Sequence, residues 1–346
     1  MSTINVDIIN PTAGNVVNVN GVEVSAHGTN NICLGDQSGQ AITTGIRSVS
    51  IGDLSLKTAT YHSDNVAIGH QALEANAGGG NTAVGSWALR AVTNGIQNDA
   101  FGAYSLLQLT TGGNNSGLGG NAGGNLASGN RNTFVGFGAG LQFTNTGDGN
   151  VIVGNTNGYA NAGGSGDNNT FVGKDAGWSF AGGNDNVILG KFTTFMGTGI
   201  TGNNNIQIGT DSVKASLTAS NSITLGNSSH NVLRCAVTSI TSLSDSRDKE
   251  EVAELAVGLE FVKELNPVSF VWNDRDESGK HGVKDFGFIA QDLKSTQEKY
   301  EMAETLGLVY EENPEKLEAS YGKLIPILVQ AIKELSAKVE ALESKK

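Results

Sequence analysis

The segments 65-NVAIG-69 and 81-NTAVG-85 decide the fold of this chain. Each places an Asn four residues before a Gly and an apolar residue (Leu, Ile, Val or Phe in the different copies) directly before that Gly. The same pattern occurs twelve times, and its closing glycines are 16 to 19 residues apart. The residue four places before the glycine is Asn in ten copies and Ser in two, Ser48 and Ser222. A short internal repeat therefore organises the chain from about residue 27 to residue 243.

Each repeat predicts one short β-strand. Val66 and Ile68 alternate with Ala67, which is the pattern of a strand. Gly69 ends this strand where the backbone needs a positive φ or a close approach, and Asn65 can bond its own turn or stack in a ladder. Because so short a strand cannot bury its apolar face alone, we expect neighbouring units to stack and bury it. The predicted fold is mainly β, a β-solenoid or β-roll of about twelve units.

Metal and cofactor sites are not expected. The nearest approach to a calcium-binding roll is 163-GGSGD-167, but its Asp falls one place early and most units carry at most one acid. The five His have no ligand spacing, and Cys33 and Cys235 have none that suggests a disulfide framework or zinc site. We expect both Cys to be small buried thiols.

The charge and hydropathy of the chain exclude two kinds of partner. The formal net charge is −12, and neither part of the chain is basic, so nucleic acid is not expected as a partner. The first thirty residues do not form a signal peptide, and no window has eighteen apolar residues. Membrane insertion is therefore not expected.

The composition changes after Leu243. Of the 48 glycines, 42 lie before this point, whereas the last 103 residues hold 36 charged side chains. This part predicts an α+β domain: a helix from Asp248 to Pro267, strands in 267-PVSFVW-272 and 284-KDFGFIA-290, a polar segment, then strands in 306-LGLVYEE-312 and 316-KLEASY-321.

The C-terminal segment 324–346 predicts a coiled coil. Its apolar residues recur at intervals of three and four: Ile325, Leu328, Ile332, Leu335, Val339 and Leu342. β-branched residues at the first seam position with Leu at the second favour two strands, so this pattern leaves the oligomer number open. Pro326 falls in the first turn, where a helix tolerates it.

The stretch 244-SDSRDKE-250 has two interpretations. In the first it begins a helix, with Ser244 or Ser246 as the cap and acids near the positive end of the dipole. In the second, Ser244 and Lys249 form a nucleophile–base dyad. Residues five apart on one helix differ by about 140° in direction. The dyad therefore requires Ser244 to be extended and Lys249 to lie in the turn behind it.

This stretch resembles a known family. SDSRDK matches the S-D-x-R-x-K signature of the endosialidase-type intramolecular chaperone, the self-cleaving C-terminal domain of phage tail spikes and fibres. Downstream, NPVSFVW at 266–272, GFIAQDL at 287–293 and YGKLIPILVQAIKEL at 321–335 are also similar to that family, in its order. The repeats in turn resemble the β-roll heads of trimeric surface adhesins and the shafts of phage tail fibres.

The resemblance implies a site of self-cleavage. The chain would be cut once, between Leu243 and Ser244, by a single-turnover endopeptidase with Ser244 as nucleophile and Lys249 as base; Asp245, Arg247 and Gln291 would support it. An ordinary lysine has a pKa of about 10.4, so the base needs desolvation or a second cation nearby. Arg247 could be that cation, or it could simply pair with Asp245.

The resemblance also implies a homotrimeric phage tail fibre, made in the host cytoplasm and carried on the virion tail. Residues 1–26 would attach to the virion, 27–243 would form the fibre that binds a host-surface glycan or protein receptor, and 244–346 would be the chaperone. One alternative is an adhesin-like fibre with an uncut trimerisation domain. Another is a glycan-degrading tailspike, which needs paired carboxylates about 5 to 9.5 Å apart, whereas the acids of residues 1–243 are scattered singly.

Trp87 and Tyr104 occupy the same slot of adjacent repeats, two residues after their glycines. They could form an aromatic ladder on which sugars stack. They could equally pack between chains of the oligomer.

Overall fold

The computed structural model describes residues 17–19, 22–25, 30–61, 63–76, 78–141, 146–155, 166–178, 180–193, 201–212, 218–227, 229–230, 232–234, 242–273, 281–311 and 313–345. Its internal contacts divide the chain into two compact units, Met1–Asn227 and Ser228–Lys346. We call them the solenoid unit and the C-terminal unit, and each is described by itself. Cys235 and most of the predicted attachment segment 1–26 lie outside the described residues.

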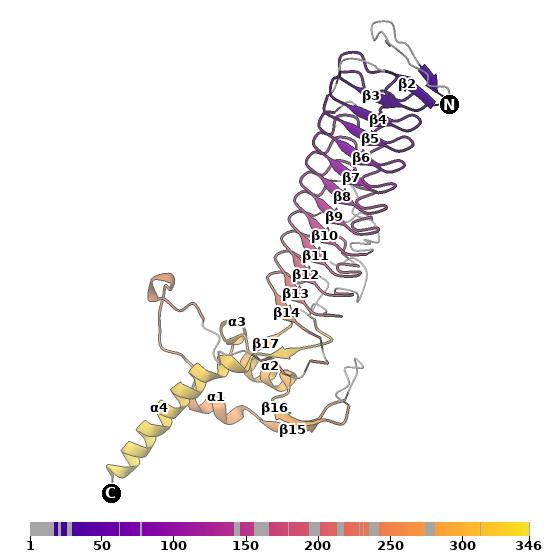
Figure 1. Cartoon of the computed structure of the whole chain (residues 1–346). Coiled ribbons are helices and arrows are strands. Elements are labelled where there is room, and N and C mark those ends of the chain that lie inside the picture. Colours follow the sequence, from indigo (N-terminus) through magenta and orange to yellow (C-terminus); the bar gives the residue numbers. More distant parts are fainter. Residues whose placement is uncertain are drawn as a thin grey trace. The chain divides into compact units, whose positions relative to one another are not determined.

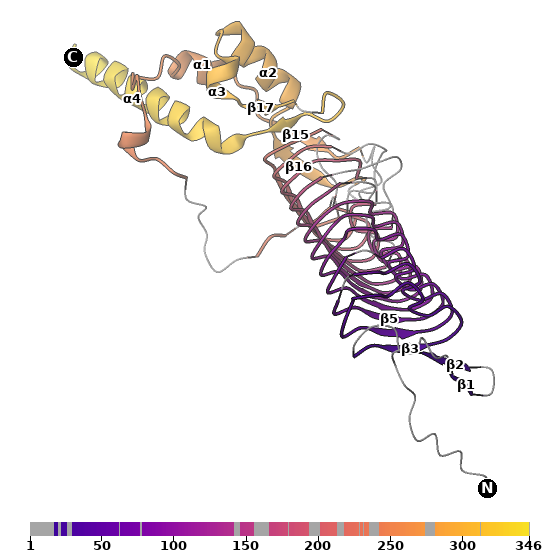
Figure 2. The same cartoon turned by 90° about the horizontal axis from the view of Figure 1, so that it is seen from above.

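The solenoid unit is built on one sheet of fourteen strands that follow one another in sequence order (Figures 1 and 2). Strands β1 to β3 pair antiparallel, and from β3 to β14 each strand pairs parallel with the next. The strands are β1 (Val17–Val19), β2 (Val22–Ser25), β3 (Ile32–Leu34), β4 (Val49–Ile51), β5 (Val66–Ile68), β6 (Thr82–Val84), β7 (Asp99–Phe101), β8 (Ser116–Leu118), β9 (Thr133–Val135), β10 (Val151–Val153), β11 (Thr170–Val172), β12 (Val187–Leu189), β13 (Ile206–Ile208) and β14 (Ile223–Leu225). Strands β3 to β14 are the twelve repeats, so the predicted mainly β solenoid is confirmed.

Each strand turns its middle residue inward, and this corrects one prediction. In β5, Ala67 is buried, whereas Val66 is half-buried and Ile68 is exposed. The middle residue is buried in every strand from β3 to β13. Stacking therefore does not bury the apolar pair of each repeat, contrary to expectation. The first and third residues of a strand share one face, and the narrow interior is already filled by the middle residues and by turn leucines such as Leu73 and Leu89.

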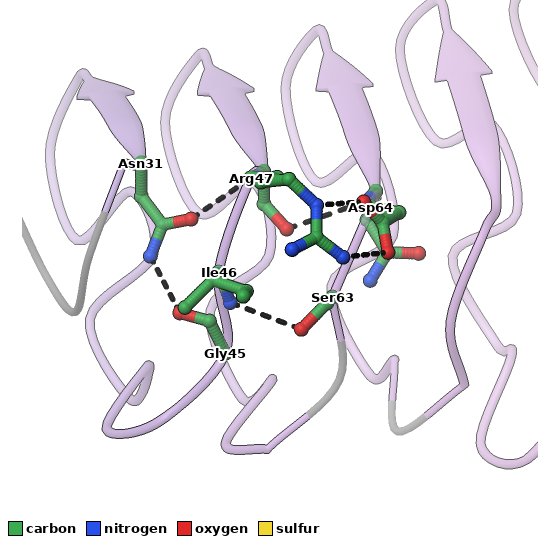
Figure 3. A network of polar contacts seen from close by, with 8 residues as sticks. Asn31, Gly45, Ile46, Arg47, Ser63 and Asp64 are labelled. Atoms are coloured by element: carbon green, nitrogen blue, oxygen red, sulfur yellow. Dashed lines mark hydrogen bonds and ion pairs between the residues drawn. The ribbon is translucent and has the colours of Figure 1, made fainter.

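The Asn before each strand forms a buried ladder along the solenoid, as the sequence suggested. Asn98 Oδ1 accepts hydrogen bonds from the backbone N–H of Asn115 at 3.0 Å and from Asn115 Nδ2 at 2.9 Å. Asn98 Nδ2 also donates to the Gly112 carbonyl at 2.9 Å. Figure 3 shows the N-terminal start of the ladder, where Asn31 Nδ2 donates to the Gly45 carbonyl at 2.8 Å. The buried amides thus satisfy one another from turn to turn, which offsets the free-energy cost of burying polar groups.

We expect Asn115→Ala to destabilise the solenoid by about 2–6 kcal/mol. The change removes the acceptor of the Asn132 backbone N–H and the donor to the Gly129 carbonyl, and each of these two buried groups costs about 1–3 kcal/mol when it is left unsatisfied. Chemical unfolding, with amide exchange read at β7, β8 and β9, measures the loss. Ser116→Ala, at the exposed neighbouring position, is the control and should change stability by less than about 0.5 kcal/mol. Equal stability of the two variants would contradict a stabilising role for the ladder.

The C-terminal unit contains several short helices, two small sheets and one long helix, α4, of 20 residues. Its elements are η2 (Ser246–Asp248, a 3-10 helix), α1 (Leu259–Glu264), β15 (Val268–Val271), β16 (Lys284–Gly287), α2 (Ala290–Lys299), α3 (Ala303–Leu306), β17 (Val309–Tyr310), β18 (Glu318–Ala319), η3 (Tyr321–Lys323) and α4 (Leu324–Glu343). β15 pairs antiparallel with β16, and β17 with β18. The four predicted strands are present, and Pro326 lies in the first turn of α4 as expected.

Two helix predictions in this unit need correction. The helix expected from Asp248 is confined to α1, which begins at Leu259 after Gly258. Glu334 Oε2 of α4 accepts a hydrogen bond from the Leu259 N–H at 2.9 Å and so satisfies a free donor of the first turn. Val252, which the periodicity placed in the helix, is 80% exposed. The polar segment after β16 contains the helix α2. The sequence of α2 shows little helical periodicity of apolar residues, because only Leu293 and Gln297 are buried on this helix.

Helix α4 has two apolar faces with different surroundings. Leu324, Ile327 and Ala331 are buried, and the first two belong to a cluster that includes Phe261 of α1. The predicted coiled-coil seam lies on the rest of the helix and is exposed, with Ile332 at 66% and Leu335 at 50%. The helix is therefore anchored in its own chain by one face and leaves the seam unpartnered within the described part of the chain.

Candidate functional site

The backbone around Ser244 has the break that the dyad requires. Asp245 is extended, with φ −68° and ψ 136°, and residues Ser246–Asp248 then form η2. Lys249 follows this single turn and is extended again, with φ −129° and ψ 134°. Lys249 therefore lies just after the turn, whereas the sequence predicted it within the turn. The chain bends sharply enough for the side chain of Lys249 to return to Ser244.

Ser244 and Lys249 are in contact. Lys249 Nζ donates to Ser244 Oγ at 2.6 Å and lies 3.3 Å from the Ser244 carbonyl oxygen. The preceding residue, Leu243, is fully exposed. Ser242 Oγ donates to the Leu243 carbonyl oxygen over 3.5 Å. A hydroxyl and an amine thus meet directly beside the Leu243–Ser244 peptide bond.

The helix-start interpretation is also partly realised, but with a different cap. The side chain of Asp245 accepts from the Arg247 backbone N–H at 2.9 Å and caps η2. Neither Ser244 nor Ser246 has this role. The Ser244 hydroxyl therefore remains available to Lys249.

Arg247 pairs with Asp245 instead of facing Lys249. Arg247 Nη2 donates to Asp245 Oδ2 at 2.6 Å, and Arg247 Nε donates to Oδ1 at 3.0 Å. The side-chain and backbone hydrogen bonds from Arg247 lower the pKa of the Asp245 carboxyl, and the side-chain bond raises the pKa of the Arg247 guanidinium. Of the two roles considered for Arg247, the geometry favours the plain ion pair.

Gln291, the remaining supporting residue, is on the first turn of α2 and is exposed. Among the described residues it makes no hydrogen bond to Ser244 or Lys249. Sequence reasoning also missed Ser242, because a Ser two residues before Ser244 carries no distinctive signal.

Trp87 and Tyr104, the candidate glycan contacts, lie side by side on the solenoid unit. Their ring centroids are 5.7 Å apart with the planes inclined by 46°. Two neighbours escaped the sequence reasoning: His70, whose Nδ1 accepts from Trp87 Nε1 at 3.1 Å, and Arg90, whose guanidinium carbon lies 4.2 Å from the Trp87 ring centre. His70 directly follows the closing glycine of the preceding repeat, and Arg90 comes three residues after Trp87. A comparison of these neighbouring positions in adjacent repeats would have found both.

Two classes of site find no support in the described ranges. No group of three or more His, Cys, Asp or Glu side chains is placed to hold a metal ion there. No helix described in the structure has the length and apolarity that crossing a membrane requires. Cys33 is buried, as predicted.

Comparison with known families connects the contact at Ser244 to a domain type. A model of the family described as chaperone of endosialidase (Peptidase_S74) matches residues 244–300, so the match begins at Ser244 itself. This family implies a self-cleaving chaperone domain. No curated protein and no solved structure gave a match. Residues 244–300 thus carry a domain of the endosialidase chaperone type, and with a parallel β-solenoid before it the chain has the organisation of a tailspike or fibre protein with a C-terminal chaperone domain.

Proposed function

We propose that this protein is a homotrimeric viral tail fibre that binds a receptor on the host surface. In this proposal its C-terminal domain directs trimerisation and folding and then cuts the chain between Leu243 and Ser244. The observation that supports cleavage best is the 2.6 Å hydrogen bond between Lys249 Nζ and Ser244 Oγ, at the residue where the family match begins.

The proposed reaction has two steps. Ser244 Oγ attacks the carbonyl carbon of Leu243 while a neutral Lys249 amine takes the hydroxyl proton. The C–N bond then breaks, the Ser244 nitrogen receives a proton from the Lys249 ammonium, and the Leu243 acyl group is left as an ester on Ser244 Oγ. Water hydrolyses this ester to give the Leu243 carboxylate and restores the Ser244 hydroxyl. The peptide bond is cut once, and no further substrate is processed.

Lys249 needs a different environment from the one that a single chain provides. Ser244 and Lys249 are both exposed, and only burial or a nearby cation favours the neutral amine that the first step requires. Arg247 is committed to Asp245. We therefore infer that assembly of the oligomer supplies the burial, so that cleavage follows assembly.

Two exposed apolar surfaces support an oligomer. On the solenoid unit, outward residues of successive strands form one stripe, which includes Phe101, Leu118 and Ile208. On α4 the exposed seam has coiled-coil spacing. Contiguous apolar surface of this kind marks an interaction site. Three copies joined through both surfaces would hide them from water.

The repetitive solenoid explains why a folding helper would be needed. Each strand pairs in register with a nearly identical neighbour, such as Val66 with Thr82 and Ile68 with Val84. A slip of one turn would pair similar residues at little cost. A C-terminal domain that associates first would align all chains, and its removal would then trap the finished fibre kinetically.

The remaining parts of the proposal concern the position of the fibre. The N-terminal segment 1–26 would attach to the virion tail, and the chain would be made in the host cytoplasm. The solenoid would then present its turns to the host surface.

The proposal is tested by the masses of the assembled protein. We expect light scattering of the full chain to report a trimer and intact-mass measurement to report two products, residues 1–243 and 244–346. A variant with Ile332→Glu and Leu335→Glu introduces charge into the seam, where both side chains are exposed in the single chain. It should remain monomeric, and its rate of cleavage should fall at least about tenfold, because charged residues at seam positions oppose association.

Ala337→Glu is the matched control, because Ala337 is exposed on α4 but does not belong to the seam. It should assemble and cleave like the wild type. A wild-type trimer that stays uncut would support the adhesin alternative instead. A seam variant that cleaves normally would contradict the dependence of cleavage on assembly.

A further inference from the structure

A shallow groove crosses three successive turns of the solenoid unit. It is lined by Glu74, Ala75, Arg90, Ala91, Leu107 and Gln108, and its volume is about 430 Å³. Each turn contributes two adjacent residues, so the groove runs from turn to turn. Its middle turn contributes only the small Ala91 beside Arg90, which leaves room for a ligand to approach the backbone closely.

Arg90 connects this groove to the aromatic residues. Its Nε donates to Glu74 Oε2 at 2.8 Å, and the same guanidinium stacks on the Trp87 ring. The Trp87 ring continues the row to His70 on one side and to Tyr104 on the other, with centroid distances of 6.4 and 5.7 Å. The groove and the aromatic row therefore form one surface on the same three turns.

Several polar groups of this surface remain available to a ligand. Arg90 Nε and Gln71 Nε2 both donate to Glu74 Oε2, and Glu74 Oε1 accepts no hydrogen bond within the described structure. Burial raises the pKa of Glu74, but the hydrogen bonds from Arg90 and Gln71 and the positive charges of Arg90 and Lys57 together outweigh it, so that its pKa lies below the ordinary value. The carboxylate is thus charged at neutral pH. The side-chain amide of Gln108 and the hydroxyl of Tyr104 also make no hydrogen bond among the described residues.

The aromatic residues occupy backbone positions that do not favour them. Trp87 and Tyr104 have φ values of 65° and 61°, in the left-handed region. Asn121 holds the equivalent position one turn later, with φ 57°, and Asn suits this conformation better than an aromatic residue does. The same slot is left-handed in other turns too, where it holds Leu54 and Phe192. The conformation therefore belongs to the repeat, and it turns the side chains of this slot the same way in successive turns.

We propose that this surface binds a neutral oligosaccharide whose chain runs along the solenoid axis. Tilted aromatic rings offer faces for the C–H surface of a sugar, and a carboxylate, a guanidinium and an amide offer hydrogen bonds to its hydroxyls. One acid and one base compensate each other, so the groove does not select a strongly charged ligand. Successive turns are about 4.7–4.9 Å apart, so the groups repeat along the axis as sugar units repeat along a chain.

The proposal rests on the proposed function, because it gives the chemical class of the receptor that the fibre would bind. The position of the two rings argues against the alternative that Trp87 and Tyr104 pack between chains. The outward residues of strands β3 to β14, which support the oligomer, lie on the strands, whereas these two rings lie in the turns that follow β6 and β7.

The experiment uses the full wild-type protein on a printed array of neutral and acidic bacterial surface oligosaccharides. The best-bound glycan is then titrated in solution while tryptophan fluorescence is recorded. We expect the array to show binding to neutral glycans. Trp87→Ala and Glu74→Gln should each weaken the measured affinity at least about tenfold, and Tyr104→Ala should weaken it by a similar factor, because one ring or one carboxylate is lost from the contact.

Matched controls separate the groove from the rest of the solenoid. Tyr61→Ala removes an exposed aromatic ring outside the groove, and Asp64→Asn removes the carboxylate of the Arg47–Asp64 ion pair, which Figure 3 shows. Both should bind like the wild type. Light scattering and intact-mass measurement on the same samples report assembly and cleavage independently of the glycan.

Three results would overturn the inference: no glycan bound, binding to acidic glycans only, or groove variants that bind like the wild type. If the protein still assembles and cleaves, these results leave the proposed function standing and remove only the saccharide site. If Trp87→Ala and Tyr104→Ala instead lose the trimer, the two rings pack between chains and the proposal is wrong.

Discussion

Ser244→Ala is expected to leave the chain as a single product of 346 residues, where the wild type yields two. The substitution removes only the hydroxyl that accepts the hydrogen bond from Lys249. Without this oxygen no ester can form at Leu243, so the loss should be complete rather than partial. Lys249→Arg should also prevent cleavage, because arginine keeps its proton at any accessible pH and cannot act as the base. Intact-mass measurement of each purified variant reports the result.

Ser246→Ala is the control for this experiment. Ser246 lies on η2, two residues from Ser244, and is exposed. Its carbonyl accepts a hydrogen bond from the Lys249 backbone N–H at 3.3 Å, which the substitution keeps, and its hydroxyl makes no hydrogen bond to Lys249 in the described structure. This variant should be cut like the wild type. If Ser244→Ala is cut as well, the dyad is not the agent of cleavage.

Hydroxylamine distinguishes the acyl shift from direct hydrolysis of the amide. An ester at Ser244 Oγ reacts with hydroxylamine and leaves a hydroxamate on Leu243, whereas an intact amide does not react under mild conditions. We expect the wild type to carry this hydroxamate and both dyad variants to lack it.

Gly119→Ala is expected to destabilise the solenoid strongly. A methyl group on Gly119 would lie 2.5 Å from the oxygen and 2.6 Å from the carbonyl carbon of Gly136 in the next turn. The φ of Gly119 is +134°, which an L-residue rarely adopts. The backbone strain costs about 1–3 kcal/mol and the overlap about 1–3 kcal/mol more, which makes about 2–6 kcal/mol in total. The next turn cannot move aside easily, because the Gly136 N–H donates to the Leu118 carbonyl at 2.8 Å.

The neighbouring Gly120 provides a matched comparison. Its added methyl would meet the Phe137 ring at 3.3 Å, a flexible side chain, and its φ lies outside the left-handed region. Gly120→Ala should therefore cost less than about 1 kcal/mol. Thermal unfolding and limited proteolysis compare the two variants. Equal stability would show that the close stacking of glycines does not limit the solenoid.

The sequence was informative wherever a pattern repeats locally. The spacing of Asn65, Asn81 and Asn98 predicted both the strands and the ladder, because each copy reports the same environment again. The residues of the α4 seam were predictable for the same reason, because its apolar residues recur at intervals of three and four along the sequence. The helix expected from Asp248 failed because the apolar residues before Gly258 pack without helical structure: Leu255 contacts the core while Val252 points to water.

The candidate site was predictable in its residues but not in its geometry. The motif indicated Ser244 and Lys249, yet only the bend at η2 brings Lys249 Nζ to Ser244 Oγ. The role of Arg247 was open between two possibilities until its ion pair with Asp245 was seen. His70 and Arg90 were missed because they join Trp87 from different slots of the repeat.

By itself the sequence determined the period of the repeat, the number of repeats and the residues of the seam, because these are properties of consecutive residues. Only the tertiary structure decided which residue of each strand points inward, and it turned out to be the middle one, such as Ala67, rather than the flanking Val66 and Ile68. It also decided that Glu74, Trp87 and Arg90 share one surface. The physical reason is the same in both cases: the path of the backbone around a narrow coil sets which side chains fit inside and which meet from turn to turn.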